Sequence, residues 1–161
     1  MSKLKVRDLM TTQLVTLQPT DTIKKAAIKL AVDNVSGAAV VDNRNHLLGI
    51  VSETDILGVV LKYQLDLEDD NSDSEMLTYS LDSSSEPDAM LKKISEEISS
   101  IEVSRIMTRT VLTTAPDATI IEVLRSMLEL NVGRVPVVEK GVVIGIISRS
   151  DIIFAMYHKK V

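Results

Sequence analysis

Residues 49–55, Gly-Ile-Val-Ser-Glu-Thr-Asp, recur 96 positions later as residues 145–151, Gly-Ile-Ile-Ser-Arg-Ser-Asp. In both copies a glycine precedes two β-branched apolar residues, a serine and, three positions after the serine, an aspartate. An apolar run that ends at Ser-x-x-Asp is typical of a buried strand leading into a helix N-terminus. We therefore expect each copy to close a strand and open a helix.

The similarity continues outward from this motif. An earlier segment, Val6-Arg-Asp-Leu-Met-Thr11, returns as Val103-Ser-Arg-Ile-Met-Thr108 at an offset of 97. The offset falls to 96 only between residues 42–46 and 139–141, where a hairpin loop absorbs the deletion. A register kept over so many positions identifies an internal duplication.

Each copy predicts the same order of elements, β-α-β-β-α. The expected ranges are 14–17, 23–35, 38–41, 47–51 and a helix from about 54, and then 111–114, 120–132, 135–138, 142–147 and a helix from about 150. Thr119 and Glu122 form an expected capping box. The fold class is therefore α/β (α+β), with two βαββα repeats. Units of about 60 residues are marginal alone, so the two must share a core.

The predicted domains are residues 1–65 for the first repeat, 66–100 for an insert and 101–161 for the second repeat. Within the insert, residues 66–88 hold nine acidic residues and no Lys or Arg, so we expect a flexible segment. Residues 89–101 have an apolar stripe and predict an extra helix that packs on the second repeat or on a partner protein. Support within the chain is the favoured interpretation.

Composition excludes several classes of function. Because nine of the 23 acidic residues lie in 66–88, the rest of the chain carries 14 acids against 18 bases, which suits a small anionic ligand. Aromatic residues make up only 2%, too few for stacking on single-stranded nucleic acid. The sequence has no cysteine and no apolar run long enough to span a membrane, so we expect a cytoplasmic protein without a thiolate metal site.

The repeated Gly-x-x-Ser-x-x-Asp motif has two interpretations. A helix N-terminus with a serine hydroxyl and an aspartate carboxylate offers acceptors to the two hydroxyls of a ribose. The same Ser-x-x-Asp pattern also serves simply as a helix capping box. Its occurrence at matching places in both copies favours the ligand-binding interpretation.

The order of these motifs resembles that of CBS domains paired as a Bateman module, over about residues 3–62 and 101–160. The resemblance implies two repeats packed through their sheets about a pseudo-twofold axis, with two clefts. It further implies that AMP, ADP, ATP or an adenosyl compound such as S-adenosylmethionine binds in the clefts as a regulatory ligand, with no resident cofactor. A homodimer of such pairs and an effector protein are the implied partners, with no nucleic acid and no membrane.

By the same resemblance, Asp55 and Asp151 hold ribose, and Arg134 reaches phosphate in the Asp55 cleft. The alternative for Arg134 is a solvated side chain at the edge of a strand. The other implied ligand-binding residues are Val15, Thr16, Ala38, Ala39, Ser52, Thr54, Leu112, Thr113, Val135, Pro136, Ile146, Ser148 and Arg149. The first copy has Gly37 where the second has Arg134, so the clefts should be unequal, with Arg149 as a substitute phosphate partner for Asp151.

Nothing in the sequence predicts catalysis. The two histidines, His46 and His158, lie far from the Ser-x-x-Asp motifs, and no base or metal cluster accompanies a nucleophile. We therefore predict a regulatory module and no enzyme. The alternative is a dimeric interaction adaptor that binds no ligand.

Overall fold

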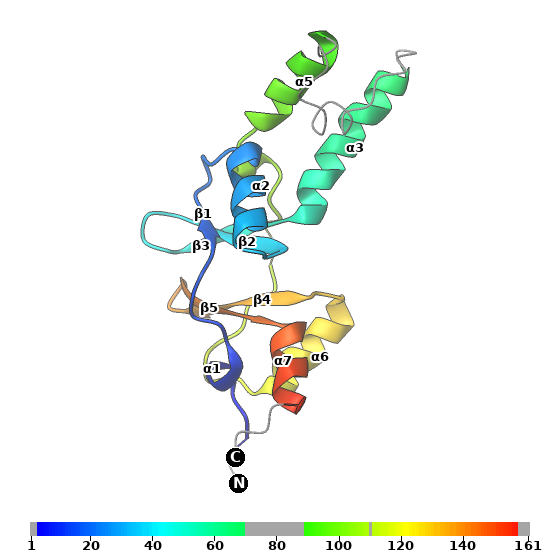
Figure 1. Cartoon of the computed structure of the whole chain (residues 1–161). Helices are drawn as coiled ribbons and strands as arrows, with labels where there is room; N and C mark the ends of the chain where they lie inside the picture. Colours follow the sequence, from blue (N-terminus) through cyan, green and yellow to red (C-terminus); the bar gives the residue numbers. More distant parts are fainter. Residues whose placement is uncertain (1–2, 70–88, 110, 158–161) are drawn as a thin grey trace.

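The two repeats stack with their sheets facing each other and their helices outside, in a computed structural model described over residues 3–69, 89–109 and 111–157 (Figure 1). One sheet has the order β1(Thr16–Leu17)–β2(Gly37–Val41)–β3(Leu47–Ser52), with β1 parallel to β2 and β3 antiparallel. The other pairs β4(Arg134–Glu139) with β5(Val142–Ser148). This arrangement confirms the predicted fold class.

The strand expected at 111–114 is reduced to a single parallel bridge between Thr114 and Val137. In the first repeat the equivalent pairing has two steps, Thr16 with Ala39 and Leu17 with Val40. The residue that corresponds to Ala39 is Pro136, which has no N–H to donate to a neighbouring strand. The sheet of the second repeat therefore loses most of its third strand.

The helices are shorter at their C-termini than the apolar pattern predicts. Helix α2(Ile23–Val32) and helix α6(Ile120–Leu130) each stop before an asparagine with a φ of 53°, Asn34 and Asn131. Asparagine tolerates this left-handed conformation, which ends a helix. The capping box at the start of α6 is confirmed, because Thr119 accepts from the Glu122 backbone and Glu122 accepts from the Thr119 backbone.

The first segment of each repeat packs into the core of the other repeat. Helix α1(Val6–Leu9) places Val6, fully buried, beside Met127 and Val135 of the second repeat. The 3-10 turn η1(Val103–Arg105) and the residues after it place Val103 and Met107 in the core of the first repeat. The domain boundaries remain a prediction. In space, the first segment of each predicted repeat belongs to the core of the other repeat.

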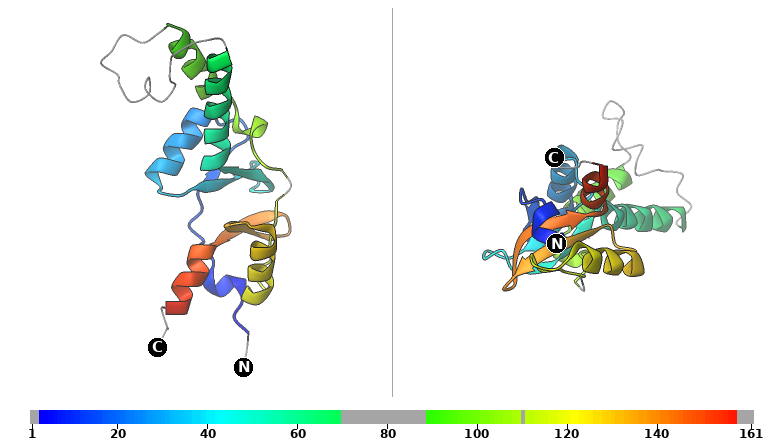
Figure 2. Two further views of the ribbon diagram at one scale, coloured as in Figure 1. Left: turned by 90° about the vertical axis from the view of Figure 1, so that its right-hand side faces the viewer. Right: turned by 90° about the horizontal axis from the view of Figure 1, so that it is seen from below.

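The extra helix packs on the first repeat, which corrects the prediction that it supports the second repeat or a partner. Helix α5(Ala89–Ser99) lies beside α2 and α3(Glu53–Asp69) (Figure 2). Leu91 and Ile98 are buried there with Ile23 and Leu67. Residues 66–69, predicted to be flexible, therefore form the last turn of α3, because burial of Leu67 holds them. Residues 70–88 of the acidic segment lie outside the described residues.

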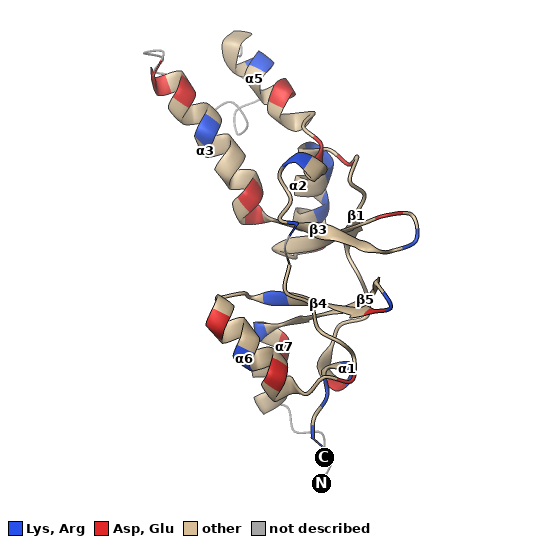
Figure 3. Ribbon diagram, turned by 180° about the vertical axis from the view of Figure 1, so that it is seen from behind, with Lys and Arg blue, Asp and Glu red and all other residues tan. Residues whose placement is uncertain are grey.

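The core between the sheets is apolar. Ala39, Val41 and Val143 are buried against one another where the sheets meet. Charged residues lie mainly on the helices and the hairpin ends (Figure 3). No polar or charged residue of the described part of the chain is buried. Over the same residues, no helix combines the length and apolar character needed to cross a membrane.

Candidate functional site

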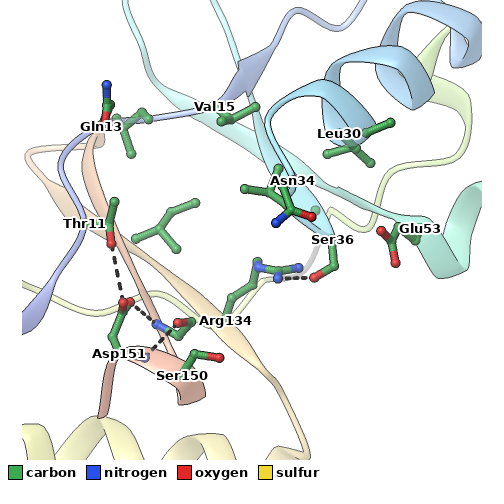
Figure 4. A pocket seen from close by; sticks show the side chains of 16 residues that line it. Thr11, Gln13, Val15, Leu30, Asn34, Ser36, Glu53, Arg134, Ser150 and Asp151 are labelled. Carbon is green, nitrogen blue, oxygen red and sulfur yellow. Dashed lines mark hydrogen bonds between the residues drawn. The ribbon is translucent and has the colours of Figure 1, made fainter. Parts of the chain in front are cut away.

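A pocket of about 430 Å³ lies between the two repeats, at the start of helix α7(Arg149–Tyr157) (Figure 4). Both repeats contribute to it. The residues that line it are Thr11, Gln13, Leu14, Val15, Leu30, Ala31, Asn34, Val35, Ser36, Gly37, Glu53, Arg134, Ile146, Ser148, Ser150 and Asp151. Five of the residues implied by the resemblance therefore come together here: Val15, Arg134, Ile146, Ser148 and Asp151.

Asp151 both caps helix α7 and borders the pocket. Its Oδ2 accepts from the Ser148 backbone N–H at 2.9 Å, and its own N–H donates to the Ser148 hydroxyl at 3.1 Å. Its other oxygen, Oδ1, accepts a long hydrogen bond of 3.5 Å from the Thr11 hydroxyl. Since the cap uses one oxygen and Thr11 holds the other only weakly, Oδ1 retains capacity for a ligand hydroxyl.

Asp55 makes the same cap at the start of α3. Its Oδ2 accepts from the Ser52 backbone at 2.8 Å and from the Ser52 hydroxyl at 3.1 Å, and its N–H donates to that hydroxyl at 3.3 Å. Asp55 does not belong to the residues that line the pocket around Asp151. The capping interpretation of the motif therefore holds in both copies, and the Asp151 copy also borders a cavity.

Arg134 lines the Asp151 pocket, whereas the resemblance implied a place in the Asp55 cleft. Its guanidinium reaches across to the first repeat and donates to the Ser36 hydroxyl. A side chain at Gly37 would meet it, because a Cβ there would lie 2.7 Å from Arg134 Nη1. Burial lowers the pKa of Arg134, and the charge of Glu53 opposes this shift. The absence of a side chain at Gly37 thus leaves space for the guanidinium of Arg134.

The remaining implied residues lie elsewhere. Ala38, Ala39, Val135 and Pro136 are fully buried within their strands. Thr16 pairs with Ala39 in the first sheet, and Leu112 packs against the core of the second repeat. Ser52 takes part in the cap that Asp55 makes. Thr54 and Thr113 are exposed. Arg149 donates to Asn131 at 2.9 Å and is absent from the pocket lining. The role of each in ligand binding remains a prediction.

The polar residues of the pocket that sequence reasoning missed are Thr11, Gln13, Asn34, Ser36, Glu53 and Ser150. Thr11 is the last residue of the segment that recurs as residues 103–108, and this recurrence could have marked it as a candidate site residue. It lines the pocket because its backbone pairs with Ile146 of strand β5, in the opposite repeat. Over the described residues, no group of His, Cys, Asp or Glu is arranged to hold a metal ion.

The chain is similar in sequence to a known protein family and to several proteins of archaea. The family model for the CBS domain matches residues 6–62 and 103–158. The uncharacterized protein MJ1426 of Methanocaldococcus jannaschii is 32% identical over 159 residues, covering 94% of this chain and 90% of that protein. The homoserine O-acetyltransferase of Methanococcus vannielii is 31% identical over 150 residues, covering 91% of this chain but only 24% of that enzyme.

A solved structure, that of CBSX2 in complex with AMP, superposes with a TM-score of 0.69 at 25% identity and covers 96% of each chain. The family model and the relative from M. jannaschii together span both repeats. This chain therefore belongs to the CBS domain family, as a tandem pair of repeats.

Proposed function

We propose that this protein is a cytoplasmic, non-catalytic regulatory module that binds an adenine nucleotide or adenosyl ligand between its repeats and relays occupancy to an effector protein. The observation that carries the proposal is the pocket in which Asp151, Arg134 and Val15 meet. An acid, a guanidinium and an apolar wall suit the ribose, the phosphate and the base of one nucleotide.

The pocket is lined by residues from both repeats, and this feature suits a regulatory role. Thr11, Ser36 and Glu53 come from the first copy, and Arg134 and Asp151 come from the second. A ligand that contacts both copies stabilises the arrangement in which they face each other, so it biases their relative position. The related CBSX2 has been solved with AMP, which supports AMP as the first ligand to test.

The first prediction concerns ligand binding by the wild-type protein. In a panel of AMP, ADP, ATP and S-adenosylmethionine, at least one compound should raise the melting temperature and give a calorimetric isotherm. A ligand present at 100 times its dissociation constant adds about 2.7 kcal/mol to the free energy of unfolding. Chromatography of the incubated nucleotides should show no turnover. Absence of any thermal or calorimetric response would favour the ligand-free adaptor.

We also propose that the protein is a homodimer that pairs through its outer helices. Leu57, Leu61 and Leu65 are 59%, 58% and 49% exposed and recur every four residues, so they form one apolar stripe on α3. Ile121 and Leu128 on α6 are exposed as well, 63% and 65%. An exposed apolar stripe of this kind is typical of an interaction face.

The second prediction tests this stripe. Leu61→Lys should convert the dimer to a monomer, measured by light scattering after size-exclusion chromatography, because a charge would be buried without a partner. The control, Thr20→Lys, introduces the same charge at an exposed position outside α3 and should remain dimeric. A wild-type protein that is monomeric at high concentration would contradict the proposal.

A further inference from the structure

The charges around the pocket do not favour a long phosphate chain. Among the described residues that line it, Glu53 and Asp151 are acidic and Arg134 is the only base. With all three ionised the lining carries a net charge of −1. A site that is built to hold two or three phosphates would be expected to carry an excess of positive charge.

The one arginine is already engaged. Its guanidinium donates to Ser36, and the charge of Glu53 acts on it. A phosphate that approaches Arg134 must therefore do so in the field of a carboxylate that lines the same pocket. Glu53 is exposed, so this repulsion acts in a partly solvated setting and is screened by salt.

The repeat shows that the fold does not require an acid at position 53. Glu53 is the first residue of α3, where a carboxylate is favourable for the helix dipole. The corresponding first residue of α7 is Arg149, which carries the opposite charge and donates to Asn131 at 2.9 Å. Asn131 in turn corresponds to Asn34, a pocket residue. The charge at position 53 therefore contributes to the net charge of the pocket and is not fixed by the need to begin a helix there.

We propose that Glu53 is a specificity-determining residue, which makes the Asp151 pocket select adenosyl ligands with no more than one phosphate group over di- and triphosphates. This inference rests on the proposed function and narrows its ligand class. Each further phosphate adds negative charge in the pocket that Glu53 lines, whereas a nucleoside is uncharged and a sulfonium compound such as S-adenosylmethionine carries a net positive charge.

The test compares adenosine, AMP and ATP by isothermal calorimetry in metal-free buffer. Wild type should bind AMP on the order of tenfold more tightly than ATP at low ionic strength, with the ratio falling as salt screens the repulsion. Glu53→Gln, which keeps the size of the side chain, should bring the two affinities within about threefold. Glu53→Arg, which copies the charge at position 149, should make ATP the tighter ligand. Adenosine is measured beside AMP and ATP as the reference without phosphate, and its affinity should change less than that of ATP in both variants.

The outcomes separate this inference from the proposed function. If the protein binds adenosyl ligands but the ATP-to-AMP ratio is the same in wild type, Glu53→Gln and Glu53→Arg, the role of Glu53 is overturned and the proposed function stands. If neither wild type nor either variant binds any of the three compounds, and wild type does not bind ADP or S-adenosylmethionine either, both are overturned.

Discussion

Asp151→Ala is expected to weaken binding of the adenosyl ligand roughly ten- to a hundredfold, because a hydrogen bond to a charged group contributes about 1.5–3 kcal/mol. In the proposed complex the ribose donates to the carboxylate from the pocket side, where Thr11 now makes only a 3.5 Å contact with Oδ1. The substitution also removes the cap of α7, so it should lower the free energy of unfolding by about 1 kcal/mol. Calorimetry measures the first effect and chemical denaturation the second.

Asp55→Ala is the matched control for this prediction. Asp55 closes the same capping box with Ser52, at closely similar distances, so its loss should destabilise α3 by a comparable amount. Because Asp55 does not line the pocket, ligand affinity there should change little. Equal losses of affinity in both variants would mean that capping, and not ligand contact, explains the role of Asp151. Unchanged binding in both would refute the assignment of the pocket.

Sequence reasoning predicted the features that repeat. The duplication and the strand-to-helix junctions at Ser52 and Ser148 are confirmed, because each depends on a local pattern kept in two places. The order β-α-β-β-α is complete only in the first copy, since the strand expected at 111–114 is reduced to a bridge. The helix ends were wrong by a few residues, since Val35 and Val132 continue the apolar spacing after Asn34 and Asn131 have turned the backbone. Spacing alone does not detect a left-handed residue.

Sequence reasoning did not predict which copy each segment packs against. Nothing in Val6-Arg-Asp-Leu-Met-Thr11 indicates that it belongs to the core of the second repeat, because both cores offer similar Val, Ile and Ala side chains. The same exchange brings Thr11 to Asp151. The position of the Arg134 side chain in the Asp151 pocket was equally hard to predict, because it depends on neighbours in the other repeat, here Ser36 and the space that Gly37 leaves.

The exchanged segments explain the glycine of the repeated motif, and this gives the second large effect. At Gly49, an added Cβ would lie 2.7 Å from the Thr108 carbonyl oxygen and 2.9 Å from Met107 Sδ. Thr108 pairs with Ile50 through two backbone hydrogen bonds of 3.0 and 2.9 Å, so this carbonyl cannot move aside without breaking the pairing. Gly49→Ala should therefore lower the free energy of unfolding by about 1–3 kcal/mol, as overpacking of a buried site does.

Gly58→Ala makes the same chemical change where nothing stands within 4 Å of the added carbon. Gly58 lies in the interior of helix α3 and is exposed, so alanine there should raise the free energy of unfolding by about 0.8–1.0 kcal/mol through helix propensity. Urea denaturation of the two variants beside wild type measures both shifts. Opposite signs at Gly49 and Gly58 would show that the motif glycine is needed for close approach of the other repeat's Met-Thr segment. If Gly49→Ala left the free energy of unfolding unchanged or raised it, the segment of Met107 and Thr108 would not pack against β3 in solution.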